Sequence, residues 1–138
     1  MTEKEIEAFK NRIKNYNFHK EQIIKLYEEE NKLWYELSFV KGASFGERVP
    51  TTNPEVKNDK VLKYYEDIDK IRIKREEHCA EISKLDTMLE EMSDEGRTII
   101  KHIYLKGNSY EKAAEYFFTS KSSISHRINR ALLEIKYI

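Results

Sequence analysis

Apolar residues recur every three or four positions over most of this chain, and the repeat is interrupted only once by Gly and Pro. The repeat covers residues 6–37 before the interruption and residues 61–92 after it. Sustained spacing of this kind predicts amphipathic helices that pack in a coiled-coil-like manner, each about 35 residues long. The predicted seam contains Ile6, Phe9, Ile13, Tyr16, Ile23, Tyr27, Trp34 and Leu37, and then Val61, Tyr64, Ile68, Ile71, Arg75, His78, Ile82, Leu85, Leu89 and Met92.

The interruption lies between Gly42 and Pro54, where both prolines and two of the four glycines are found. It predicts a loop over residues 42–53, and Asn53-Pro54 is typical of a capped helix start. Helices joined by such a loop fold back on each other. We therefore expect an all-α protein in which residues 1–92 form a long antiparallel helical hairpin. A composition of 39% hydrophobic and 36% charged residues fits helices that bury only one side.

A hairpin of two helices covers only part of each apolar stripe, and two interpretations follow. In the preferred one, a second copy of the chain packs on the hairpin and makes a homodimer. In the other, the third segment of the same chain completes the core. The bulky residues beside the seam that we expect to be available for a second copy are Leu26, Leu33, Tyr35, Tyr65 and Ile73.

Two polar residues, Arg75 and His78, lie on the inward stripe of the second long helix. Buried polar groups can specify the register of a helix pair. Long polar side chains can also reach the rim of an interface, and we favour this second interpretation.

From residue 93 onward the pattern changes to shorter helices with polar caps. Ser93 precedes acids at a helix start, and Gly107 ends that helix. Ser109 caps a short helix whose inward residues are Ala113, Ala114 and Phe117, and Ser120 caps a final helix. The final helix places its apolar face at Ile124, Ile128, Ala131, Leu132 and Ile135. Two short helices, a tight turn and a longer helix with a polar outer face predict a helix-turn-helix over residues 93–138.

The order and spacing of these residues resemble region four of bacterial sigma factors, which reads the upstream promoter element. The resemblance covers about a third of the chain. It is carried by Arg97-Thr98-Ile99-Ile100, Tyr104 to Ala114, Ser120 to Ser125 and Arg127 to Leu132. The whole layout resembles small phage-encoded regulators of the ArpU and RinA types. These resemblances imply a DNA-binding transcription regulator, encoded by a phage or prophage, with host RNA polymerase as a second partner.

The outward side of the final helix carries hydroxyl, amide, imidazole and cationic groups and no acid, which suits phosphate oxygens and base edges. Lys121 and Arg130 are the expected phosphate or guanine contacts. The capping serines place backbone N–H groups at two helix starts. The candidate DNA-binding residues are Ser109, Ser120, Lys121, Ser122, Ser123, Ser125, His126, Arg127, Asn129 and Arg130.

The sequence departs from the sigma-factor pattern at the turn between the last two helices. Phe118 stands where such modules have glycine, and Thr119 stands where they have an aliphatic residue. Because phenylalanine is costly in the left-handed conformation, we expect a turn that is one residue longer or differently shaped.

The formal net charge is zero, but it is unevenly distributed. Eight basic and five acidic residues follow position 92, so the C-terminal segment carries +3 and residues 1–92 carry −3. This asymmetry fits a polyanion at one end. A single cysteine, Cys79, excludes an intramolecular disulfide, and we expect a soluble cytoplasmic protein without a signal peptide or membrane helix.

The pattern does not favour an enzyme. The four histidines are scattered, so neither a metal site nor a cofactor is expected, and Gly42 and Gly46 lack the Lys-Ser/Thr of a phosphate loop. Two alternatives to the regulator remain open. One is a DNA-packaging component similar to small terminase subunits of phages, which form large rings. The other is a module that binds protein.

Overall fold

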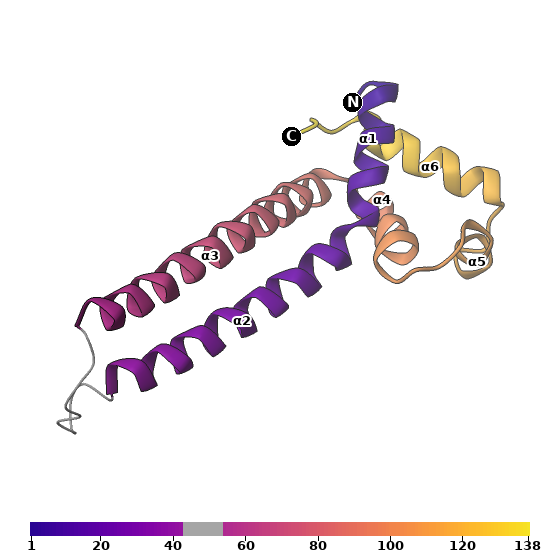
Figure 1. Cartoon of the computed structure of the whole chain (residues 1–138). Helices are drawn as coiled ribbons and strands as arrows, with labels where there is room; N and C mark the ends of the chain where they lie inside the picture. Colours follow the sequence, from indigo (N-terminus) through magenta and orange to yellow (C-terminus); the bar gives the residue numbers. More distant parts are fainter. Residues whose placement is uncertain (43–53) are drawn as a thin grey trace. The chain divides into compact units, whose positions relative to one another are not determined.

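The computed structural model describes residues 1–42 and 54–138, and it describes side chains for residues 1–40 and 59–138. The described residues form helices and no strands, which confirms the all-α class (Figure 1). The elements are α1 (Glu3–Lys14), α2 (Tyr16–Gly42), α3 (Pro54–Glu91), α4 (Asp94–Ile100), the π-helix η1 (Lys101–Leu105), α5 (Tyr110–Tyr116) and α6 (Lys121–Leu133).

The chain divides into two compact units. The first unit contains Met1–His19 and Ala80–Ile138, and the second, here called the arm, contains Lys20–Cys79. This division differs from the predicted boundary between residues 92 and 93. The predicted loop at residues 42–53 and the predicted cap at Asn53 lie outside the described residues, whereas α3 begins at Pro54 as expected.

The first predicted long helix is broken at Asn15, and the prediction of one continuous helix over residues 6–37 was wrong. The Asn15 N–H donates to the carbonyl of Arg12 at 3.1 Å and closes α1. The carbonyl of Asn15 accepts from the N–H of His19 at 2.9 Å and opens α2. Asparagine competes well for such backbone bonds at helix ends. The chain can therefore change direction here although the apolar spacing continues.

The core of the first unit includes α1, which the sequence had assigned to the hairpin. Ile6, Phe9, Ile13 and Tyr16 are buried in one cluster with the end of α3 and the helices that follow it. The physical reason is the coverage of apolar surface. The C-terminal helices are too short to enclose Ile99, Ile100 and Ile128 alone, and α1 supplies the missing apolar stripe. For this unit, the core is completed within one chain.

Polar contacts attach α1 and the start of α2 to the end of α3. Arg12 holds Glu81 through both carboxylate oxygens. The hydroxyl of Tyr16 donates to Asp86 at 2.7 Å, and burial together with this bond raises the pKa of Tyr16 to about 12. The hydrogen bond from Arg12 lowers the pKa of the Glu81 carboxyl despite its partial burial. The apolar cluster buries one side of α1, and these polar contacts orient the helix.

Arg97, one of the residues on which the predicted sigma-factor resemblance rests, caps the C-terminus of α3 and so has an internal role. Its Nε donates to the carbonyl of Leu89 at 2.9 Å, and its terminal nitrogen donates to Glu90 and Met92 at 3.2 and 3.1 Å. The last carbonyls of a helix lack partners within the helix and carry partial negative charge. A planar guanidinium satisfies several of them at once.

Inside the arm, α2 and α3 run antiparallel and side by side (Figure 1). Glu30 on α2 contacts Arg72 and Arg75 on α3, while Trp34 contacts Tyr65. Later residues of α2 thus meet earlier residues of α3. The residues buried among the described side chains of the arm are Leu26, Glu30, Leu37 and Ile68.

The buried seam of the arm is shifted from the predicted one. Leu26, which we expected to be available for a second copy, is buried, whereas Tyr27 of the predicted seam is exposed. Tyr35 and Ile73 are exposed as expected. Glu30 was not part of the predicted seam, but it is buried there with Leu26 and Leu37. Because an acid lies at a seam position, hydrophobicity alone points to the wrong face of α2.

Glu30 is buried because several donors converge on its carboxylate. Arg72 and Trp34 each donate to it at 3.2 Å, and a guanidinium nitrogen of Arg75 lies 2.9 Å from it. Burial alone would raise the pKa of Glu30, but these hydrogen bonds and the two arginine charges outweigh burial and lower it. For Arg75, the structure therefore corrects the preferred interpretation: this side chain pairs across the two helices and lies over the Tyr27 ring.

Candidate nucleic-acid interface

The helices that lead to the candidate site begin and end where the sequence predicted. Ser93 caps α4 by accepting from the N–H of Gly96. The helix continues as η1, in which the Lys106 N–H donates to the carbonyl of Lys101, and ends at Gly107 with φ +76°. Only glycine enters this conformation at no steric cost. The predicted stop at Gly107 is therefore confirmed.

Serine side chains cap the next two helices, as predicted. Ser109 Oγ accepts from the N–H of Lys112 at 3.1 Å at the start of α5. Ser120 Oγ accepts from the N–H of Ser123 at 3.1 Å at the start of α6, and it also lies 3.2 Å from the hydroxyl of Ser122. Both capping hydroxyls of the predicted site thus define where the helices start.

The turn between α5 and α6 forces a phenylalanine into the left-handed region. Phe118 has φ +54°, and its side chain is 96% exposed. The N–H of Phe118 donates to the carbonyl of Glu115, and the N–H of Thr119 donates to that of Ala114. These two bonds form the usual helix-ending motif with phenylalanine at the position that glycine normally occupies. The expectation that the turn would avoid this conformation was wrong.

The buried face of α6 is the predicted one. Ile124, Ile128, Ala131 and Leu132 are all buried, with Ala113 and Ala114 of α5 in the same cluster. Ile135 was predicted to lie in this helix; it is also buried, but it follows the end of α6 at Leu133.

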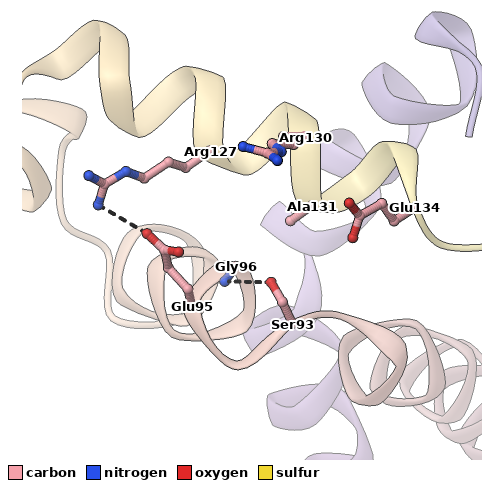
Figure 2. Close-up of a pocket in the computed structure, with 7 residues that line it drawn as sticks. All are labelled: Ser93, Glu95, Gly96, Arg127, Arg130, Ala131 and Glu134. Atoms are coloured by element: carbon pink, nitrogen blue, oxygen red, sulfur yellow. Dashed lines mark hydrogen bonds and ion pairs between the residues drawn. The ribbon is translucent and has the colours of Figure 1, made fainter.

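The crossing of α4 and α6 depends on small residues. A Cβ placed on Gly96 would lie 2.5 Å from the Cβ of Ala131, which is closer than two carbon atoms that are not bonded to each other approach. Figure 2 shows both residues beside an open pocket of about 480 Å³, lined also by Ser93, Glu95, Arg127, Arg130 and Glu134.

The outer side of α6 presents several predicted residues to solvent. Lys121, Ser122, His126 and Arg130 are exposed, and Ser123 and Ser125 are partly exposed. Ser120, Lys121, Ser122 and Ser125 line one open depression of about 670 Å³. The structure therefore brings four of the predicted residues together on one surface.

Tyr110 of α5 lines the same depression and was not among the predicted residues. Its hydroxyl lies 2.8 Å from that of Tyr104. Burial, followed by this hydrogen bond, raises the pKa of Tyr104. Tyr110 directly follows the Ser109 cap, and this position at the helix start is the sequence signal that could have identified it.

Asn129 is turned toward α1 instead of standing free on the outer face. Its side-chain oxygen accepts from Lys10 Nζ at 2.8 Å. Its assignment among the outward residues therefore needs correction, and Lys10 becomes a further cation beside α6. No local pattern could reveal this pair, because 119 residues separate its members.

Acids from neighbouring helices also approach the outer side of α6, contrary to the expectation of an acid-free surface. Arg127 pairs with Glu95 of α4 at 3.0 Å, as Figure 2 shows. Lys121 lies 3.8 Å from Glu111 of α5, with both side chains largely exposed. Arg127 is therefore partly committed to α4. The exposed pair of Lys121 is weak and can exchange for a stronger anion.

Comparisons with protein-family models, with curated proteins and with solved structures returned no match.

We also searched the described residues for a metal site and for membrane-spanning helices. His, Cys, Asp and Glu side chains there form no group of three that could hold a metal ion. His102 stacks on Tyr116 with ring centroids 4.6 Å apart. Among the described helices, none combines the length and the apolarity needed to cross a bilayer.

Proposed function

We propose that α5 and α6 form a helix-turn-helix that binds duplex DNA in a sequence-specific manner, and that the chain regulates transcription. The single observation that carries the proposal is the two-sided character of α6. One side is fully buried, and the opposite side presents hydroxyl and cationic groups from its N-terminal half. A recognition helix enters the major groove with this half.

The groups around α6 support a phosphate-contacting frame. Tyr110 lines the same depression as Lys121. Lys10 of α1 donates to the side chain of Asn129 and so adds an ammonium group beside α6. Hydroxyl and ammonium donors of this kind contact phosphate oxygens and set the register of a protein on the duplex. Ser122 and Ser125 are then the groups that reach base edges.

The resemblance to region four extends the proposal to partners and setting. It implies host RNA polymerase as a second partner and a phage-encoded regulator that acts on DNA in the cytoplasm. We propose a homodimer through the helices of the arm, because a two-fold protein matches two half-sites. Binding, not catalysis, is the proposed activity.

The proposal is tested by measuring affinity for a duplex selected from a random library. We expect Lys121→Glu and Arg130→Glu each to weaken binding at least tenfold, because each replaces a phosphate-attracting charge with a repelling one. The neutral Lys121→Gln should also lower the slope of log affinity against log salt by about one. Lys70→Glu makes the same charge change in the arm and is the matched control.

Unchanged affinity of both α6 variants, or equal loss in the control, would contradict the proposal. The mass of the protein in solution distinguishes the regulator from the DNA-packaging alternative. A dimer favours the regulator, whereas a ring of eight or more copies favours the packaging role.

A further inference from the structure

One face of α2 carries large apolar side chains that are mostly exposed to solvent. Four large side chains lie there, namely Ile24, Tyr27, Tyr35 and Phe39, each between 55% and 65% exposed. We call this set the α2 stripe. Ile24 and Tyr35 are eleven residues apart, about three helical turns, and so lie on one face. Leu26 of the buried seam is two residues from Ile24, about 200° around the helix. Most of the stripe therefore points away from α3, and Tyr27 lies at its edge, under the guanidinium of Arg75.

The α2 stripe is symmetric about its centre. Tyr27 and Tyr35 each lie four residues from Asn31, while Ile24 and Phe39 lie seven and eight residues from it. Asn31 itself is exposed. Apolar residues therefore lie on both sides of the polar Asn31, at similar distances along the helix. A two-fold interface requires a surface that complements itself, and a stripe of this form meets that requirement when the two helices run antiparallel.

A row of charged residues follows the stripe one position later, about 100° around the helix. It contains Lys25, Glu28, Lys32 and Glu36, and we call it the charged flank. In an antiparallel pair the same flank of each helix meets its copy. With the two-fold axis near Asn31, Lys25 faces the partner's Glu36 and Glu28 faces the partner's Lys32. Every facing pair then has opposite sign.

A parallel pair would lose this complementarity. It would place the charged flank against the opposite flank of the partner, where the exposed or partly exposed residues are Ile23, Trp34 and Ser38. Charges beside an apolar seam set the orientation of paired helices, and a polar residue in the seam sets their register. Both features are present here and agree on one arrangement.

We propose that α2 pairs with α2 of a second copy in an antiparallel two-fold interface through the α2 stripe, with Asn31 near the axis. The inference rests on the dimer of the proposed function and specifies its surface. Among its described residues the arm has no third helix that covers this face, and an exposed apolar stripe often marks an interaction surface. The Tyr35 and Phe39 rings, 4.8 Å apart, form an aromatic pair at the C-terminal end of the stripe.

The test measures the mass of the full chain by sedimentation equilibrium over a range of concentrations, without DNA. We expect the wild type to approach twice the 16.6 kDa of one chain. Ile24→Glu and Tyr35→Glu should each raise the dissociation constant at least 30-fold, because each buries two charges per dimer. Leu62→Glu alters an equally exposed apolar residue on α3 and should change it less than threefold. Circular dichroism checks that the variants keep their helices.

Orientation is tested by reversing charges. We expect Lys25→Glu and Glu36→Lys each to weaken the dimer about three- to tenfold, and the double variant to return to within about twofold of the wild type. An Asn31→Cys chain with Cys79→Ser should form a disulfide-linked dimer under mild oxidation.

A monomeric wild-type chain would overturn the proposal, and so would equal effects of Leu62→Glu and Tyr35→Glu. A dimer that the stripe variants dissociate but the double charge variant fails to rescue would overturn the antiparallel orientation. Because no readout involves DNA, failure here is distinguishable from failure of the DNA-binding proposal.

Discussion

The unit formed by residues 1–19 and 80–138 buries its apolar side chains differently from the arm. In the first unit, side chains from α1, the end of α3, α4, α5 and α6 meet in one cluster, and Phe9, Leu85 and Ile128 are wholly excluded from solvent. In the arm, two helices bury a narrow seam that includes the carboxylate of Glu30. Several short helices can enclose a core, whereas two long helices alone leave their outer faces exposed.

The comparison extends to what each surface is suited for. The exposed side of α6 is polar and cationic, while the exposed side of α2 is apolar with alternating charges beside it. A polar surface on a well-packed unit suits a ligand that is itself polar and charged. An apolar surface on a thin arm suits a second protein surface. This difference is the reason why we propose DNA binding for the first unit and self-association for the arm.

The largest expected effect compares one fully buried leucine in each unit. We expect Leu132→Ala to lower the free energy of unfolding by about 4 kcal/mol and Leu37→Ala by about 2 kcal/mol. The cavity at Leu132 is enclosed by several helices, whereas two helices alone can close around the cavity at Leu37. Urea unfolding followed by circular dichroism measures both. Equal losses would show that the arm packs as tightly as the first unit.

The next effect concerns the polar seam of the arm. We expect Glu30→Gln to cost about 2 kcal/mol, because Arg75 then lacks its counter-charge. The matched control, Glu66→Gln, alters an exposed acid on α3 and should cost less than about 0.5 kcal/mol. Fluorescence of Trp34, the single tryptophan, reports on this site.

The same site predicts a pH dependence. The folded-state pKa of Glu30 is lowered, so its contribution is fully present above the unfolded value of about 4.3. That contribution is lost as the pH falls through the lower folded-state pKa. We expect Glu30→Gln to unfold with a weaker dependence on pH below about 4 than the wild type. Identical pH profiles would remove Glu30 from the stability of the arm.

The smallest expected effect concerns the stability of the first unit at the turn between α5 and α6. We expect Phe118→Gly to raise the free energy of unfolding by about 1 kcal/mol, since the left-handed conformation strains any residue with a Cβ. The ring is almost wholly exposed, so little burial is lost. Phe118→Ala keeps the Cβ and should leave stability nearly unchanged. If alanine stabilises as much as glycine, the backbone conformation is not the cause.

Much of the local structure could be predicted because it depends on neighbours in sequence. The caps at Ser93, Ser109 and Ser120 and the stop at Gly107 each depend on residues within one helical turn. The buried face of α6 followed from its spacing. The turn at Phe118 could not be predicted, because a local preference against the left-handed region was overridden by the two backbone bonds that close α5.

What the sequence alone determined is the all-helical class of the described residues, the start of α3 at Pro54 and the capped helix starts after residue 92. The tertiary structure decided which helix packs against the apolar side of each other helix. It moved α1 into the core of the first unit, placed Glu30 in the seam of the arm and joined Lys10 to Asn129. Periodicity reports that a helix has an apolar side, but it holds no information about the partner that covers that side. That choice depends on contacts between residues far apart in the chain, which only the folded structure reveals.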